Sequence, residues 1–173
     1  MSPKGKGYAR RQYVPKQLRE AHFRPVPAEE FAGYWDRIPK EFNKGFIDEY
    51  TAAELRAHNA ECFKLEMGGV LYDAGYAIFP NADGSRELVA VHNNSSLHNV
   101  GRIIAQDAQA HNANLLYAFT TPVLMDMYRS VGFKETDRYK FDPEQVSDVW
   151  KRNPAYMARA IKEGWDVVEM KRG

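Results

Sequence analysis

The sequence predicts an α/β (α+β) fold with a mixed, mostly antiparallel central sheet of about six to seven strands flanked by helices. Short apolar or alternating segments follow one another, with tight turns between them, from residue 61 to residue 91, which is typical of an antiparallel meander. Residues 114–119 are apolar throughout, as in a buried parallel strand. Segments with apolar residues at helical spacing stand between these strands and around them, so helices are expected to cover the sheet.

The N-terminal part of the domain is expected to begin with one strand and two helices. Residues 23–26 are a plausible first strand, and the helix after it starts at one proline and is ended or kinked by another, at residues 27–39. Its apolar residues at helical spacing are Phe31, Tyr34, Trp35 and Ile38. A second helix is predicted at residues 51–59, because Thr51 and Glu54 have the spacing of a capping box.

Three strands joined by turns are expected next. Residues 61–67 alternate between polar and apolar, and the two glycines at 68–69 turn the chain into a strand at 70–79. An Asp-Gly pair at the tip of residues 81–84 is a hairpin signal, and it leads into the apolar, β-branched strand 87–91.

The second half of the domain is expected to alternate between strands and helices. Strands are predicted at residues 114–119, 134–139 and 165–171. The helix at 122–131 starts with Pro and stops at Gly, which is the usual asymmetry of helix ends. Residues 142–164 are longer than a hairpin needs and suggest one or two helices packed on the rim.

The segment between the strand 87–91 and the next helix is polar and rich in small residues. Residues 92–101 suit neither a strand nor a helix interior, and a helix with an apolar face follows from Val100 to His111. A buried strand therefore delivers the chain into a loop that opens onto a helix N-terminus. Backbone N–H groups and the positive end of the helix dipole meet there, so the place favours phosphate.

The chain reads Ser96-Leu-His-Asn99-Val-Gly101 at the start of the helix and Tyr128-Arg-Ser-Val-Gly132-Phe133 further on. These two motifs resemble those of the GCN5-related N-acetyltransferases (the GNAT superfamily). The family's pyrophosphate loop reads Arg/Gln-x-x-Gly-x-Gly/Ala; aligned on its last Gly, this chain has Ser96 at the Arg/Gln position, Asn99 at the middle Gly and Gly101 at the end. Asn tolerates a left-handed backbone better than most residues. The segment from Tyr128 to Phe133 is similar to the family's Tyr-x-x-x-Gly-Phe. As an order of elements, the resemblance spans roughly residues 24 to 171.

The resemblance implies acetyl-CoA as the acyl donor, an amine as the acceptor and no metal. It implies that Tyr128 protonates the departing thiolate and that Glu87 is the general base; Asp73 and Glu66 on neighbouring strands are alternatives. Thr121 stands where the family often has an Asn that contacts the pantetheine arm. The implied coenzyme-binding residues are Val89, Val91, Ser96, Leu97, His98, Asn99, Val100, Gly101, Arg102, Thr121 and Tyr128.

Two histidines lie within the polar segment. His92 and His98 each have a side chain that can titrate near neutral pH or meet phosphate as a cation. Their spacing does not indicate a metal site, because no Cys or second carboxylate completes a set.

Length and composition predict a single domain at residues 24–173, preceded by a basic, flexible arm at residues 1–23. Residues 1–20 hold six cations and one anion, which suggests an acidic partner, either nucleic acid or the surface of the mildly acidic domain itself. No apolar run is long enough for a membrane helix, and the N-terminus does not read as a secretory signal, so we expect a cytoplasmic protein. The single cysteine, Cys62, is expected in the core.

Two functions remain open at this point. One is acyl transfer from acetyl-CoA to a small amine, a protein amine or an aminoacyl-tRNA. The other is a lapsed GNAT-fold module that contacts protein or nucleic acid through its arm, motivated by the altered glycine loop. An antiparallel order throughout, with no splayed pair at 87–91 and 114–119, would indicate a different α+β fold. The oligomeric state is not predicted.

Overall fold

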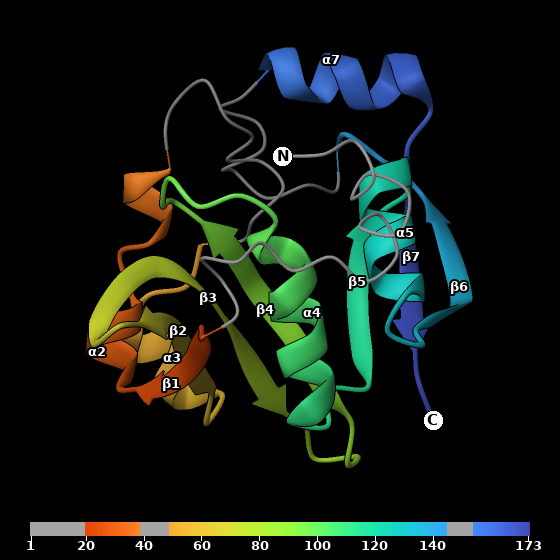
Figure 1. Cartoon of the computed structure of the whole chain (residues 1–173). Helices are drawn as coiled ribbons and strands as arrows, with labels where there is room; N and C mark the ends of the chain where they lie inside the picture. Colours follow the sequence, from red (N-terminus) through yellow and green to blue (C-terminus); the bar gives the residue numbers. More distant parts are fainter. Residues whose placement is uncertain (1–19, 39–48, 145–153) are drawn as a thin grey trace, which may run out of the picture.

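The computed structural model describes residues 20–38, 49–144 and 154–173 (Figure 1). Within them lies a seven-stranded sheet in the order β1-β2-β3-β4-β5-β7-β6. Strands β4 and β5 pair in parallel and every other neighbouring pair is antiparallel, so the predicted fold class is confirmed. The strands are β1 (His22–Val26), β2 (Glu61–Met67), β3 (Val70–Pro80), β4 (Arg86–Asn93), β5 (Leu115–Phe119), β6 (Lys134–Lys140) and β7 (Asp166–Lys171).

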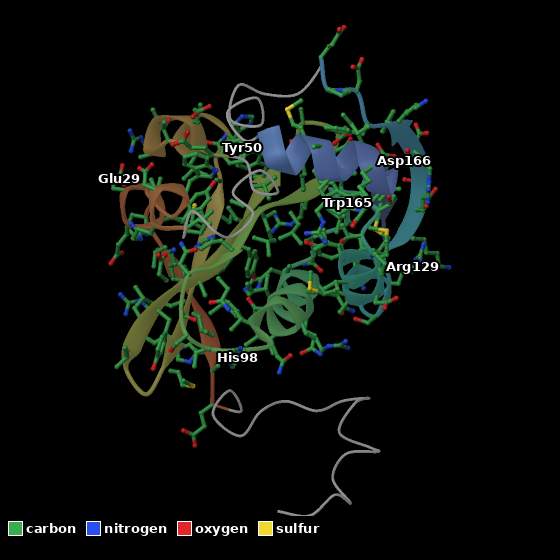
Figure 2. All side chains as sticks on the ribbon, turned by 90° about the horizontal axis from the view of Figure 1, so that it is seen from above. Glu29, Tyr50, His98, Arg129, Trp165 and Asp166 are labelled. Atoms are coloured by element: carbon green, nitrogen blue, oxygen red, sulfur yellow. The ribbon has the colours of Figure 1, made fainter. Side chains whose placement is uncertain are left out.

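Helices cover both faces of the sheet. They are α2 (Ala28–Phe31), the 3₁₀ helix η2 (Trp35–Arg37), α3 (Ala52–Ala57), α4 (Val100–Ala110), α5 (Pro122–Arg129) and α7 (Pro154–Glu163). In Figure 1, α4 and α5 lie in front of the sheet and α7 lies across its upper end. The view from above in Figure 2 shows α4 and α5 side by side on that face, with α2 on the other. We call these the α4 face and the α2 face. No helix in the described ranges is long and apolar enough to cross a membrane.

The described ends of the chain agree only partly with the predicted boundaries. Strand β1 begins one residue before the predicted strand, and residues 1–19 of the predicted arm lie outside the described residues. Helix α7 lies within the segment 142–164, of which residues 145–153 are also outside the description.

Local signals placed several elements correctly. Thr51 and Glu54 form the predicted capping box of α3: Oγ1 of Thr51 accepts a hydrogen bond from the Glu54 amide at 3.1 Å, and the Thr51 amide donates to the Glu54 carboxylate at 2.9 Å.

The prediction of a single helix at residues 27–39 is wrong, because this segment is divided into α2 and η2. Ala32 is extended (ψ 161°) and Gly33 has φ +88°, a backbone that breaks the helix between the two parts.

Strand β4 carries a bulge. Gly75 of β3 is opposite His92, but Ala77, two residues on, is opposite Val89, so β4 has one extra residue at this point. Ala90 in the bulge has φ +55°, which is unusual for any residue other than glycine. The opposing strand is equally constrained, because a Cβ on Gly75 would lie 2.0 Å from the carbonyl oxygen of Phe63.

Strands β4 and β5 meet at one end and part at the other. Their register in the described chain is the single pair Glu87 with Leu115, whereas β5 pairs with β7 along its whole length, from Leu115 to Phe119. Figure 1 shows the two strands diverging toward their upper, C-terminal ends. This is the expected splayed pair, and it rules out the alternative of an antiparallel sheet throughout. We call the region where the two strands part the wedge.

Candidate active site

The start of α4 lies at the open end of the wedge. Asn93 ends β4 and holds the following loop: its Nδ2 donates to the Leu97 carbonyl at 2.8 Å, and its Oδ1 accepts from the Ser95 amide at 3.0 Å. Asn99 precedes the helix with φ +63° and ψ +21°, so the left-handed backbone expected of this residue is confirmed. The amides of the first turn of α4 then face the loop end without partners inside the helix.

The residues predicted to bind coenzyme lie in three different environments. Val91 and Leu97 pack against the core of the α4 face, where Val100 is fully buried. Val89 belongs instead to the core of the α2 face, so the structure separates it from the others. Three of the predicted residues are exposed in the loop: Ser96, His98 and Asn99. Figure 2 shows His98 on the outer rim of the molecule.

Gly101 has a packing role that the sequence motif does not reveal. A Cβ at this position would lie 2.9 Å from Sδ of Met127 in α5, so the glycine permits α4 to approach α5. Arg102, the next residue, is half-buried in the first turn of the helix. A side chain at residue 101 would therefore require the flexible end of Met127 to move, whatever the loop binds.

Thr121 lies at the open end of β5 and begins α5. Its Oγ1 accepts a hydrogen bond from the Leu124 amide at 3.4 Å, so the hydroxyl caps the helix. Its contact with a pantetheine arm stays a prediction.

Tyr128 of α5 is buried in the core of the α4 face. It is 6% exposed and belongs to the cluster that contains Val100, Leu116 and Phe133. Burial raises the pKa of its hydroxyl above the ordinary value. Among the described residues, none makes a hydrogen bond with this hydroxyl, although it lies in the core.

The carboxylates considered as bases lie in three different places. Glu87 is at the closed end of the wedge, about 10 Å along β4 from Ala90 at the rise of a strand. Glu66 on β2 forms an ion pair with Arg24 of β1 and accepts a hydrogen bond from His22 of the same strand. Asp73 lies in a hydrogen-bonded network on the α2 face. The structure does not bring these groups together.

A buried network joins β2, β3 and β4 on the α2 face, and sequence reasoning missed it. Lys64 is 3% exposed and His92 is 2% exposed. The Lys64 ammonium lies 2.6 Å from Asp73 Oδ1 and 2.7 Å from His92 Nε2, and His92 Nδ1 lies 2.8 Å from the carbonyl oxygen of Ala90. The lysine within the strand 61–67, which is otherwise largely apolar, was the signal available in the sequence.

This network extends to the short 3₁₀ helix and the loop after β4. The guanidinium of Arg37 donates to Asp73 from Nε at 2.6 Å and from Nη2 at 3.1 Å, and Asn94 Nδ2 donates to the same carboxylate at 3.1 Å. Burial opposes ionisation of Asp73, but the hydrogen bonds from Arg37 and Lys64 outweigh it and hold its pKa well below the usual range. Asp73 is therefore an ionised anchor with its oxygens engaged, which makes it a poor general base.

His92 was expected in the loop as a group that titrates near neutral pH, and both expectations are wrong. It is part of β4, and burial, followed by the charge of Lys64, lowers its pKa to about 3. A polar residue is tolerated inside the strand because both ring nitrogens have partners. The ring stacks on Tyr34 with the centroids 4.6 Å apart and meets the edge of Phe31.

Metal ligands and the single cysteine were also considered as sources of chemistry. No group of three or more His, Cys, Asp or Glu side chains within it is placed to hold a metal ion. Cys62 is buried in the core, as expected, and burial raises the pKa of its thiol to about 11.

Comparison with solved structures identifies the fold. Mutant forms of the spermidine/spermine N-acetyltransferase SpeG from Vibrio cholerae match with a TM-score of 0.51 and 13% identity, over 87% of this chain and 92% of that one. An N-acetyltransferase from Staphylococcus aureus Mu50 matches with a TM-score of 0.50 and 12% identity, over 87% of this chain and 95% of that one. No protein-family model and no curated protein sequence matches the chain. The chain has the fold of the GCN5-related N-acetyltransferases.

Proposed function

We propose that the protein is an N-acyltransferase that moves an acetyl or other acyl group from an acyl-coenzyme A to an amine. The observation that carries the proposal is the wedge. There β4 and β5 part, the bulged Ala90 lies in the parting strand, and α4 begins beyond the same end. An extended thioester would lie where these two strands part, and a helix N-terminus stands beyond the same end.

The start of α4 is suited to the pyrophosphate of the coenzyme. Its first N–H groups have no partners within the helix, and the helix dipole favours an anion there. Asn99 adopts the left-handed backbone that the family motif achieves with glycine, so the turn survives this substitution. Ser96, His98 and Arg102 are the nearby side chains that would add polar contacts.

Tyr128 is the proposed proton donor. The hydroxyl is protonated at neutral pH, as in any tyrosine whose pKa is not lowered, so it carries the proton that a departing thiolate needs. The bound thioester would supply the acyl group. Glu87 remains the predicted base, and its place at the closed end of the wedge implies that the amine proton reaches it through water.

Calorimetric titration with CoA and transfer of labelled acetyl groups to a panel of amines test this function. We expect micromolar binding of CoA and transfer to at least one amine. Tyr128→Phe should lower kcat by about tenfold or more while KM for acetyl-CoA stays unchanged. Tyr117→Phe is the matched control, because Tyr117 is exposed on β5 and its hydroxyl bonds to Glu169, so kcat should not change.

Absence of CoA binding at millimolar concentration would refute the proposal. The lapsed binding module would then be the better explanation, and the partner of residues 1–20 would become the question.

A further inference from the structure

The bulge in β4 is held by a chain of hydrogen bonds that begins outside the wedge. His92 Nδ1 donates to the carbonyl oxygen of Ala90, so this nitrogen carries the ring proton and Nε2 is the acceptor. The Lys64 ammonium donates to Nε2 and also to Asp73, which Arg37 anchors in turn. The hydrogen bonds between Lys64 and Ala90 all run the same way: Lys64 donates to His92, and His92 donates to the Ala90 carbonyl. We call this chain the relay.

The relay fixes the orientation of one peptide group. The carbonyl of Ala90 and the N–H of Val91 belong to the same planar trans peptide, so they point in opposite directions. His92 lies on the α2 face, against Phe31 and Tyr34. The Val91 N–H is therefore directed away from the His92 ring that holds the Ala90 carbonyl. The Val91 side chain packs against the core of the α4 face.

Stability alone does not account for this arrangement. Burying an ammonium group and an imidazole is costly, and an apolar pair of similar volume often gives equal or greater stability. Left-handed backbone at a residue other than glycine also persists only where its surroundings enforce it. In this chain the enforced residue, Ala90, lies in the parting strand of the wedge.

We propose that Lys64 and His92 are positioning residues for acyl transfer, which hold the Ala90–Val91 peptide so that the Val91 N–H can bind the oxygen of the acyl carbonyl. The inference rests on the proposed function and adds residues to it. As an amine attacks, negative charge develops on that oxygen, and a donor fixed in advance stabilises the charge without reorganisation. Neither side chain touches the reacting atoms; both act through the backbone.

The experiment compares two charge-removing variants within the three neighbouring strands β2, β3 and β4. Lys64→Met breaks the relay between β2 and β4. Arg86→Met is the matched control, because Arg86 of β4 pairs with Glu61 of β2 at 2.8 Å at the other end of the strands. Both variants lose one cation and an ion pair, but the relay is intact in the control.

We expect Lys64→Met and His92→Phe to lower kcat by about 10- to 100-fold, with KM for acetyl-CoA and calorimetric CoA affinity close to wild type. His92→Asn keeps one donor and one acceptor and should recover part of the loss. Arg86→Met should retain the wild-type kcat even if its melting temperature falls.

The failures of the two ideas can be told apart. If the wild type transfers no acyl group, the proposed function fails and the positioning role falls with it. If the wild type is active and Lys64→Met and His92→Phe retain its kcat, the positioning role alone is overturned. Nitrogen NMR of the histidine rings adds a readout that is independent of activity: an imidazolium, or a proton on Nε2 of His92 at neutral pH, would overturn the relay itself.

Discussion

Replacement of His92 by Phe should change how the stability of the protein depends on pH. The folded state holds this ring neutral, with a pKa of about 3 instead of 6.5, because of burial and then the charge of Lys64. As the pH falls below the ordinary value, the unfolded chain binds a proton that the folded chain does not, so stability is lost. From about pH 7.5 to about pH 5, this single group should lower the free energy of unfolding by about 2 kcal/mol.

The assay is urea unfolding of wild type and His92→Phe at several pH values in this range. The difference between the two pH profiles isolates His92, since the other titrating groups are shared. We expect the wild type to lose about 2 kcal/mol more than the variant on acidification, with similar m values. Parallel profiles would refute the reasoning, because they would show that His92 has the same pKa in both states.

Three further predictions concern backbone conformation and the capping of a helix. Gly75→Ala should destabilise the fold by at least about 3 kcal/mol in urea unfolding, because the new Cβ meets the Phe63 carbonyl; Gly69→Ala, in open space at φ +79°, should cost only about 1 kcal/mol, and equal costs would contradict the clash. Thr51→Ala should cost about 1 kcal/mol through loss of the α3 cap, and an unchanged urea midpoint would show that the cap contributes nothing. Asn99→Gly should add up to about 1 kcal/mol by relieving the left-handed backbone and should tighten CoA binding in calorimetry; weaker binding would show that the Asn side chain itself contacts the coenzyme.

Part of the candidate site was predictable because its causes are local. The left-handed turn at Asn99 follows from the conformational range of that residue, and α4 begins directly after it, as the apolar spacing predicts. The cap at Thr51 depends on two residues three apart in the chain. Such features are decided within one turn of backbone, so the sequence alone determined them, along with the order of strands and helices.

The tertiary structure decided what depends on partners distant in the chain. His92 reads as a loop residue until Lys64, 28 positions earlier, supplies a buried hydrogen bond that lets β4 continue through it. The bulge at Ala90 depends on the register of β4 against β3, and the glycine at 101 depends on the approach of α5. Burial and register are properties of assembled strands and helices, because the free energy of a polar group in the core is set by the neighbours it meets there.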